Sequence, residues 1–307
     1  LCTANFPDPL IEDPSKHFDV KLYTGVSTNA TGDTQNITGL NFEPELMWFK
    51  VRNQGWYHWI YDQVRGNNGL VPHEPDDEFN DSSIHSWNSD GVTVKYGGLT
   101  TLNYNNASYV AWAWDAASST ATRTDGSITS YIRASQSAGF SIVTWTGTGA
   151  SATIGHGLNA APEMIIVKCR SHGSTDWPVY HSALGAGNRI YLSATNKSSA
   201  GTNWNSTSPT SSVFSVGNNP DTNGNGRTYV AYCFAPVAGY SAIGKYTGNG
   251  LSNGPFVYTG FKVAYLMVKN ASTDGETWTI YDSTRDPYNL ATHRLQPNDA
   301  GAEQSGV

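Results

Sequence analysis

The sequence predicts an all-β protein built from tandem β-sandwich modules of the jelly-roll or concanavalin-like type. Three observations support this class. Segments rich in β-branched and aromatic residues alternate with clusters of Gly, Asn, Asp, Ser and Pro, as strands alternate with turns. No segment carries a sustained apolar period of 3.6 residues with capping signals. One pattern of strands recurs three times along the 307 residues, which indicates a repeat architecture.

The first strand of the pattern alternates in polarity and ends in an aromatic residue followed by Thr and Gly; it occurs at 20–25, 142–147 and 243–248. The second strand is apolar and ends in Lys; it occurs at 44–50, 162–168 and 263–269. The third strand follows after a short loop, at 58–62, 177–181 and 278–282. Because independent markers keep closely similar spacings, we treat the three segments as copies of one module.

A closing strand completes the first two copies, at 109–114 and 229–234, where successive side chains face opposite sides of a sheet. The third copy needs the same strand, but none follows 278–282. We therefore expect either that the natural protein continues beyond Val307 or that a different element closes this copy. The start at Leu1, without Met, likewise leads us to expect a piece or a processed form of a longer protein.

These markers divide the chain into five segments. We expect an N-terminal linker at 1–16, copy one at 17–115, a linker at 116–137, copy two at 138–236 and a partial copy three at 237–307. The linker at 116–137 includes one further strand candidate around 128–132. The junction between copies two and three is short, so we expect these two copies to pack as a rigid pair.

The composition excludes several classes of partner. Charged residues make up 14% of the chain and the net charge is -7, with no cluster of Lys and Arg, so we expect no nucleic-acid partner. No run approaches the roughly 18 apolar residues of a membrane span, so we expect no membrane insertion. Cys2, Cys169 and Cys233 are too few for a disulfide framework and too widely spaced for a zinc motif, which predicts buried or free thiols.

Titratable residues provide a weak case for catalysis. The sequence has no nucleophile elbow, no metalloprotease motif and no phosphate-binding loop. His156 lies between two glycines and is predicted to be a turn residue. The segment 221–226 resembles the first half of a calcium loop, but Tyr232 stands where the bidentate Glu should be, which favours a turn.

An acidic insertion in copy one is the strongest candidate for a metal or for paired carboxylates. Calcium is the cation it would take, through Asp76, Asp77, Glu78 and Asp81. Glu74, Asp76 or Asp77 could alternatively serve as acid and base of a glycoside hydrolase. The competing interpretation is a solvated acidic loop, and we predict no catalytic residue and no cofactor other than this calcium.

Aromatic residues in polar stretches are the main lead toward a binding function. A flat exposed ring can stack on a sugar while Asn, Asp and Ser bind its hydroxyls. The carbohydrate-binding candidates are Trp56, Tyr57, Trp59, Trp87 and Trp204. The alternative, that aromatic residues at recurring strand positions form the module cores, applies to Trp48, Trp59, Trp112, Trp114, Trp177 and Trp278.

Several motifs together resemble a family of uncharacterised tailed-bacteriophage virion proteins. These motifs lie at 2–9, 17–20, 138–143, 155–158, 229–235, 239–241 and 254–261. The resemblance implies a tail-fibre or other surface-exposed virion protein, with a SPRY-like domain often upstream and a longer C-terminus. It implies no catalytic residues.

The resulting hypothesis is a phage virion structural protein, made in the host cytoplasm and placed on the virion surface, that mediates attachment to a host-surface glycan. Its partners would be that glycan, other virion proteins and further copies of itself. The first alternative is a polysaccharide depolymerase or other glycoside hydrolase. The second is a purely architectural virion module.

Overall fold

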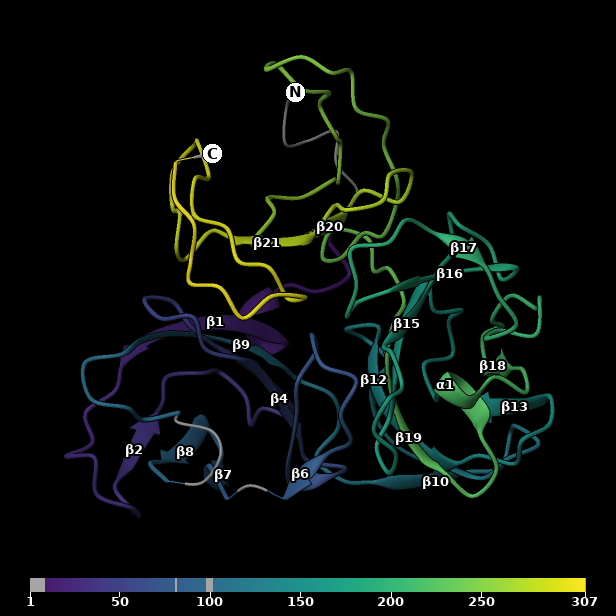
Figure 1. Cartoon of the computed structure of the whole chain (residues 1–307), viewed down its shortest axis with the longest axis horizontal. Helices are drawn as coiled ribbons and strands as arrows, with labels where there is room; N and C mark the ends of the chain where they lie inside the picture. The colour runs from purple at the N-terminus through teal and green to yellow at the C-terminus, as the bar shows by residue number, and fades with distance from the viewer. Residues whose placement is uncertain (1–8, 81, 98–101, 307) are drawn as a thin grey trace.

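The computed structural model describes residues 9–80, 82–97 and 102–306 (Figure 1). The predicted all-β class is confirmed, with strands β1 to β21 and almost no helix. The helical elements among the described residues are a 3-10 turn, η2 (Pro14–Lys16), and one short turn of α-helix, α1 (Pro220–Asn223). In the described part of the chain, no helix is long and apolar enough to cross a membrane.

Copy one forms two packed sheets. The larger sheet has the order β1-β9-β3-β4-β5-β6. Its strands are β1 (Phe18–Thr24), β9 (Ser108–Trp114), β3 (Leu46–Val51), β4 (His58–Asp62), β5 (Gly66–Leu70) and β6 (Phe79–Asn80). The smaller sheet is β2 (Thr34–Ile37), β8 (Gly91–Lys95) and β7 (Ile84–Asn88). Side chains from both sheets, including Phe49, Tyr61 and Val94, form one buried cluster, so the copy is sandwich-like.

Copy two repeats this arrangement around its own cluster. Its larger sheet has the order β10-β11-β12-β19-β14-β15-β16-β17. The strands are β10 (Ala121–Arg123), β11 (Ser130–Ser135), β12 (Phe140–Thr146), β19 (Thr228–Phe234), β14 (Met164–Cys169), β15 (Pro178–His181), β16 (Asn188–Tyr191) and β17 (Ser199–Ala200). A pair of strands, β13 (Ala152–Gly155) and β18 (Val213–Val216), covers one face. The segment 116–137 is therefore more than a connection, because β10 and β11 extend this sheet.

Copy three contributes a two-stranded sheet of β20 (Tyr265–Lys269) and β21 (Trp278–Asp282). The register pairs Tyr265 with Asp282 and Lys269 with Trp278. These strands occupy the positions of β3 and β4 in copy one and of β14 and β15 in copy two. The segment 243–248, expected to be the first strand of this copy, has no regular secondary structure.

The three copies share one central core, and Figure 1 shows them arranged around it. Strand alternation explains how one sheet serves two cores: on β3, Trp48 faces the central cluster, whereas Met47 and Phe49 face the sandwich of copy one. The central cluster includes residues from every copy, among them Trp112, Trp177, Tyr232, Trp278 and Ile280. All three copies therefore pack together, where we had expected only copies two and three to form a rigid pair.

The recurring aromatic-Thr-Gly has a steric cause. A Cβ at Gly25 would lie 2.1 Å from the carbonyl oxygen of Tyr104, and one at Gly147 would lie 2.4 Å from that of Gly224. Both contacts are with the turn that precedes the closing strand, so only glycine allows this turn to approach.

Cys169 and Cys233 are buried and form no disulfide, as the sequence predicts. Cys2 lies outside the described residues.

Candidate functional site

A lysine at the end of the second strand, buried in copies one and two and more exposed in copy three, ties each copy to its neighbour. Lys50 Nζ donates to the carbonyls of Val51, Gln54 and Trp56 at 2.8, 3.3 and 2.6 Å, and to that of Ala300 in copy three at 3.0 Å. The equivalent Lys168 donates to Thr175 within copy two and to Pro75 of copy one at 2.8 Å. Lys269 donates to Thr195 of copy two at 3.0 Å. The three contacts form a closed cycle.

Tryptophan indoles at the start of the third strand repeat two of these three contacts. Trp177 Nε1 donates to the carbonyl of Val71 in copy one at 3.1 Å, and Trp278 Nε1 to that of Tyr191 in copy two at 2.8 Å. Copy one has His58 at this position, and His58 Nδ1 accepts from Trp48 Nε1 at 3.0 Å. The copies are thus related by a pseudo-threefold arrangement of contacts as well as by sequence.

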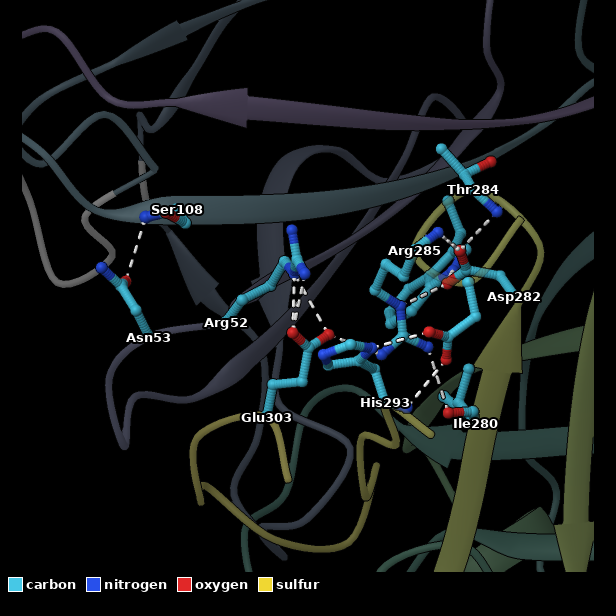
Figure 2. Close-up of polar contacts among 11 residues, drawn as sticks. Arg52, Asn53, Ser108, Ile280, Asp282, Thr284, Arg285, His293 and Glu303 are labelled. Atoms are coloured by element: carbon cyan, nitrogen blue, oxygen red, sulfur yellow. Dashed lines mark hydrogen bonds and ion pairs between the residues drawn. The ribbon is translucent and has the colours of Figure 1, made fainter. Parts of the chain in front are cut away.

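An ionic chain crosses the junction between copies one and three (Figure 2). The Arg52 Nη2 to Glu303 Oε2 distance is 2.7 Å, and Arg285 Nη1 donates to Glu303 Oε1 at 2.9 Å. Arg285 Nε donates to Asp282 Oδ2 at 2.6 Å, and the indole of Trp112 donates to the same oxygen at 3.0 Å. Asp282 and Arg285 have no exposed side-chain surface, so this pair belongs to the core.

An equivalent ionic chain crosses the junction between copies one and two. Arg170 donates to both oxygens of Glu78 at 2.9 Å, and Arg65 Nη1 lies 3.5 Å from Glu78. Arg65 Nε donates to Asp62 Oδ2 at 2.6 Å, where the hydroxyl of Tyr232 also donates at 2.8 Å. Part of the acidic insertion therefore joins two copies.

The junction between copies two and three lacks these charges. Ala271 replaces the first arginine of the chain, and its carbonyl accepts from Ser198 N and Ser198 Oγ, both at 3.0 Å. His181 and Leu184 stand where the other junctions have Asp and Arg. Nδ1 of His181 accepts from Ala183 N at 3.1 Å. This bond holds the turn that follows the third strand, but no ion pair accompanies it.

The loop from 52 to 57 presents two aromatic rings at the junction of copies one and three. Lys50 and Arg52 fix the loop from behind, and Asn53 Oδ1 accepts from Ser108 N at 3.0 Å (Figure 2). Trp56 is partly buried and packs edge-on against Tyr104, with ring centroids 5.0 Å apart. Tyr57 is 46% exposed. The corresponding loops of copies two and three carry no Trp, Tyr or Phe, so this surface is particular to copy one.

A buried histidine lies beside the exposed ring. The His73 side chain is 6% exposed, and its ring packs edge-on against Tyr57 at 4.6 Å. Burial and the nearby Lys50 charge lower the pKa of His73 to about 4, so its imidazole is neutral at pH 7. Neither ring nitrogen has a hydrogen-bond partner among the described residues, although Nε2 lies 3.6 Å from Glu74 Oε1. A neutral imidazole has one donor and one acceptor, which suits a hydroxyl.

The space behind this loop is a narrow crevice. It is lined by Lys50, Trp56, Tyr57, Trp59 and Tyr109, among others, and has room for little more than a water molecule. A ligand could therefore contact only the outer face of Tyr57 and the rim of Trp56.

The structure separates the other aromatic candidates. Trp59 and Trp204 are 8% and 1% exposed and belong to the sandwich cores of copies one and two, so neither ring is available to a ligand. Trp87, on β7, is partly buried against the copy-one core. β7 belongs to the smaller sheet, whereas the 52–57 loop connects β3 and β4 of the larger sheet. The candidate surface therefore reduces to Trp56 and Tyr57.

The predicted metal ligands are not gathered into a site. Asp76 and Asp77 are exposed, and Glu78 is engaged by two arginines. Asp81 lies outside the described residues. No group of three or more His, Cys, Asp or Glu residues in the described ranges is arranged to hold a metal ion.

The two predicted turn positions differ: His156 follows β13 in a segment without regular secondary structure, and the segment 221–226 begins in α1 and ends in a turn. His156 is fully buried, with Nδ1 accepting from Leu158 N at 3.2 Å. Asp221 lies in α1, which Asn219 caps by accepting from Asp221 N at 2.9 Å.

Comparison with known proteins gives one match. A model of a domain of unknown function, DUF7483, matches residues 13–307. The chain belongs to this family. No curated protein and no solved structure matches it. Since the DUF7483 description names no activity, the function must be argued from the residues themselves.

Sequence reasoning missed the ionic chains. A signal was present, because Asp-x-x-Arg occurs at both 62–65 and 282–285, directly after the third strand of two copies. Read as a repeat feature, it would have indicated a structural role for these charges.

Proposed function

We propose that this chain is a non-catalytic attachment module that binds a glycan through Tyr57 and Trp56. The observation that carries the proposal is a tyrosine ring that is 46% exposed, on a loop held by Lys50, which also bonds to copy three. A sugar ring can stack on the exposed face of Tyr57, beside the rim of Trp56. A single exposed ring provides weak binding, so repeated display would be needed for firm attachment.

The biological setting is part of the same proposal. Because the sequence resembles tailed-phage virion proteins, we propose that the module lies on the surface of a phage virion, assembles with other virion proteins and further copies of itself, and has a host-surface glycan as its receptor. A low content of charged residues and a large rigid core fit a protein that works outside the cell.

The test is binding to purified lipopolysaccharide and capsular polysaccharides, followed through the fluorescence of the chain. We expect Tyr57→Ala to weaken binding about tenfold and Tyr57→Phe to retain it, because the ring and not the hydroxyl makes the contact. Tyr131→Ala is the matched control, because Tyr131 is 51% exposed on the copy-two sheet. Equal affinity of the Tyr57→Ala and Tyr131→Ala variants would refute the site. New reducing ends released from the polysaccharide would refute the non-catalytic assignment.

A further inference from the structure

One edge of β20 is open. In copy one, β9 pairs with β1 on one side and β3 on the other, and in copy two β19 pairs with β12 and β14. β20 takes the place of β3 and β14 but pairs only with β21 within the described ranges 9–80, 82–97 and 102–306. An unpaired edge presents a row of amides and carbonyls that a further strand can engage.

The hydrogen-bond pattern identifies which amides face this edge. Ser283 N donates to the carbonyl of Ala264 at 2.9 Å, so alternation directs Leu266 and Val268 toward β21. The amides of Tyr265, Met267 and Lys269 then point to the open edge. In the other copies, the residue two positions beyond the repeat lysine bonds to the closing strand: Arg52 N to Ser108 O and Arg170 N to Thr228 O, both at 2.7 Å.

The glycine of the aromatic-Thr-Gly motif gives an independent indication. Gly25 and Gly147 pack tightly against the turn before the closing strand. A Cβ added at the equivalent Gly248 would have no described atom within 4 Å. Copy three therefore keeps the glycine that the turn requires, without the turn.

Apolar exposure is concentrated on the same copy. Leu266 on β20 is 44% exposed, whereas the equivalent Met47 and Ile165 are fully buried. Copy three holds eight of the thirteen large hydrophobic side chains exposed in the described structure, namely Tyr246, Leu251, Phe256, Val257, Tyr258, Leu266, Tyr288 and Leu290. Such a concentration is typical of an interaction surface.

We propose that the open edge of β20 accepts an extended segment that adds as a β-strand and whose sequence follows the closing strands of copies one and two. β9 and β19 share the order Tyr, Val, Ala, aromatic, small, aromatic from Tyr109 and Tyr229 onward. The incoming strand runs antiparallel to β20, as β9 and β19 run antiparallel to their neighbours. Main-chain bonds provide affinity and alternate side chains provide specificity.

The cycle of junctions predicts where the fourth residue of the incoming strand lies. Tyr232 of copy two meets Asp62 of copy one, and Trp112 of copy one meets Asp282 of copy three. The position of copy two that is equivalent to Asp62 and Asp282 is His181. The incoming aromatic residue therefore faces a half-buried histidine in place of a carboxylate.

The test uses the whole chain and a peptide with the sequence of Ser108–Trp114. Bound peptide should slow amide hydrogen exchange at Tyr265, Met267 and Lys269. The amides of Leu266 and Val268, which already face β21, are the internal control and should change little. Protection confined to the first set supports the proposal, and absence of binding or protection elsewhere overturns it.

Backbone methylation of the peptide provides the matched control. Because Arg52 N bonds to Ser108 O, alternate residues of the closing strand, Val110 and Trp112, face β3. Methylating these two amides should weaken binding at least about tenfold, whereas methylating Tyr109 and Ala111 should weaken it less than about threefold. Equal effects would overturn the proposed register. Sedimentation of the chain alone should show no dimer, because a dimer joined through two β20 edges would identify a second copy as the occupant and overturn the proposal.

Discussion

The three junctions between copies share one set of main-chain contacts but differ in charge. Two are crossed by a buried ionic chain ending at Asp62 or Asp282, whereas the junction of copies two and three has His181 and Ser198 instead. The lysine-to-carbonyl bond is present at all three. This difference indicates that the lysine and its carbonyls define the junction and that the ionic chain is an addition to it.

The presence of an ionic chain at a junction also correlates with the presence of a closing strand there. Each buried Asp receives a hydrogen bond from the closing strand of another copy, through Trp112 or Tyr232. The junction of copies two and three, which has an exposed Lys197–Asp274 ion pair but no buried ionic chain, is the one whose closing strand does not occur among the described residues. A carboxylate there would be buried without its second donor, and an unsatisfied buried charge is costly.

The largest effect should come from breaking an ionic chain. Asp62→Ala or Asp282→Ala breaks a fully buried ion pair, leaving the arginine only Glu78 or Glu303, and should lower the free energy of unfolding by about 3–5 kcal/mol, measured by urea denaturation. His181→Ala, at the matching position of the junction between copies two and three, should lower the free energy of unfolding by less than about 1 kcal/mol. Equal losses at all three positions would contradict the distinction.

Replacing the lysine that ends the second strand of each copy should have a smaller effect on the free energy of unfolding. The size of the effect depends on how deeply that lysine is buried. Lys168→Met leaves the carbonyls of Pro75 and Thr175 without their buried donor and should cost about 2 kcal/mol in the same assay. Lys269 is more exposed, so water can replace its ammonium, and Lys269→Met should cost less than about 1 kcal/mol. A larger loss at Lys269 would show that burial does not set the strength of this contact.

A third comparison concerns one position in copies one and two, where the effect depends on pH. Burial raises the pKa of Glu45 from 4.5 to about 7, although Arg133 lies 3.7 Å away. The folded chain holds this proton more tightly than the unfolded chain, so the stabilisation is complete below pH 4.5 and is lost as pH rises through 7.

Glu45→Gln should remove about 2 kcal/mol of the stability difference between pH 5 and pH 8, because an amide does not titrate. Glu163→Gln is the control, since Glu163 occupies the same position in copy two but is partly exposed; it should change the unfolding free energy by less than about 0.5 kcal/mol at either pH. An unchanged slope in Glu45→Gln would assign the pH dependence to other groups.

The sequence located most strands of the repeat, with 243–248 as the exception, but it did not predict how they pack. Repeated markers such as Lys50 and Lys168 located the strands, because alternation and turn residues are local signals. Alternation does not say which copy covers each face, so the central core was not predictable. Trp59 and Tyr57 are two residues apart, yet Trp59 belongs to the core and Tyr57 to the surface. The difference arises because Trp59 lies on β4, whereas Tyr57 lies in the loop before it. The pairing of Glu78 with Arg170 spans two copies and leaves no local signal.

The central claim is that the three copies form a single folding unit around the shared core. Amide hydrogen exchange of Asp282→Ala tests it most directly, because this substitution lies in copy three and the slowest amides of β19 lie in copy two. We predict that opening of β19 becomes easier by the full global loss of about 3–5 kcal/mol. Unchanged exchange in β19, with faster exchange confined to β20 and β21, would mean that the copies fold as independent domains.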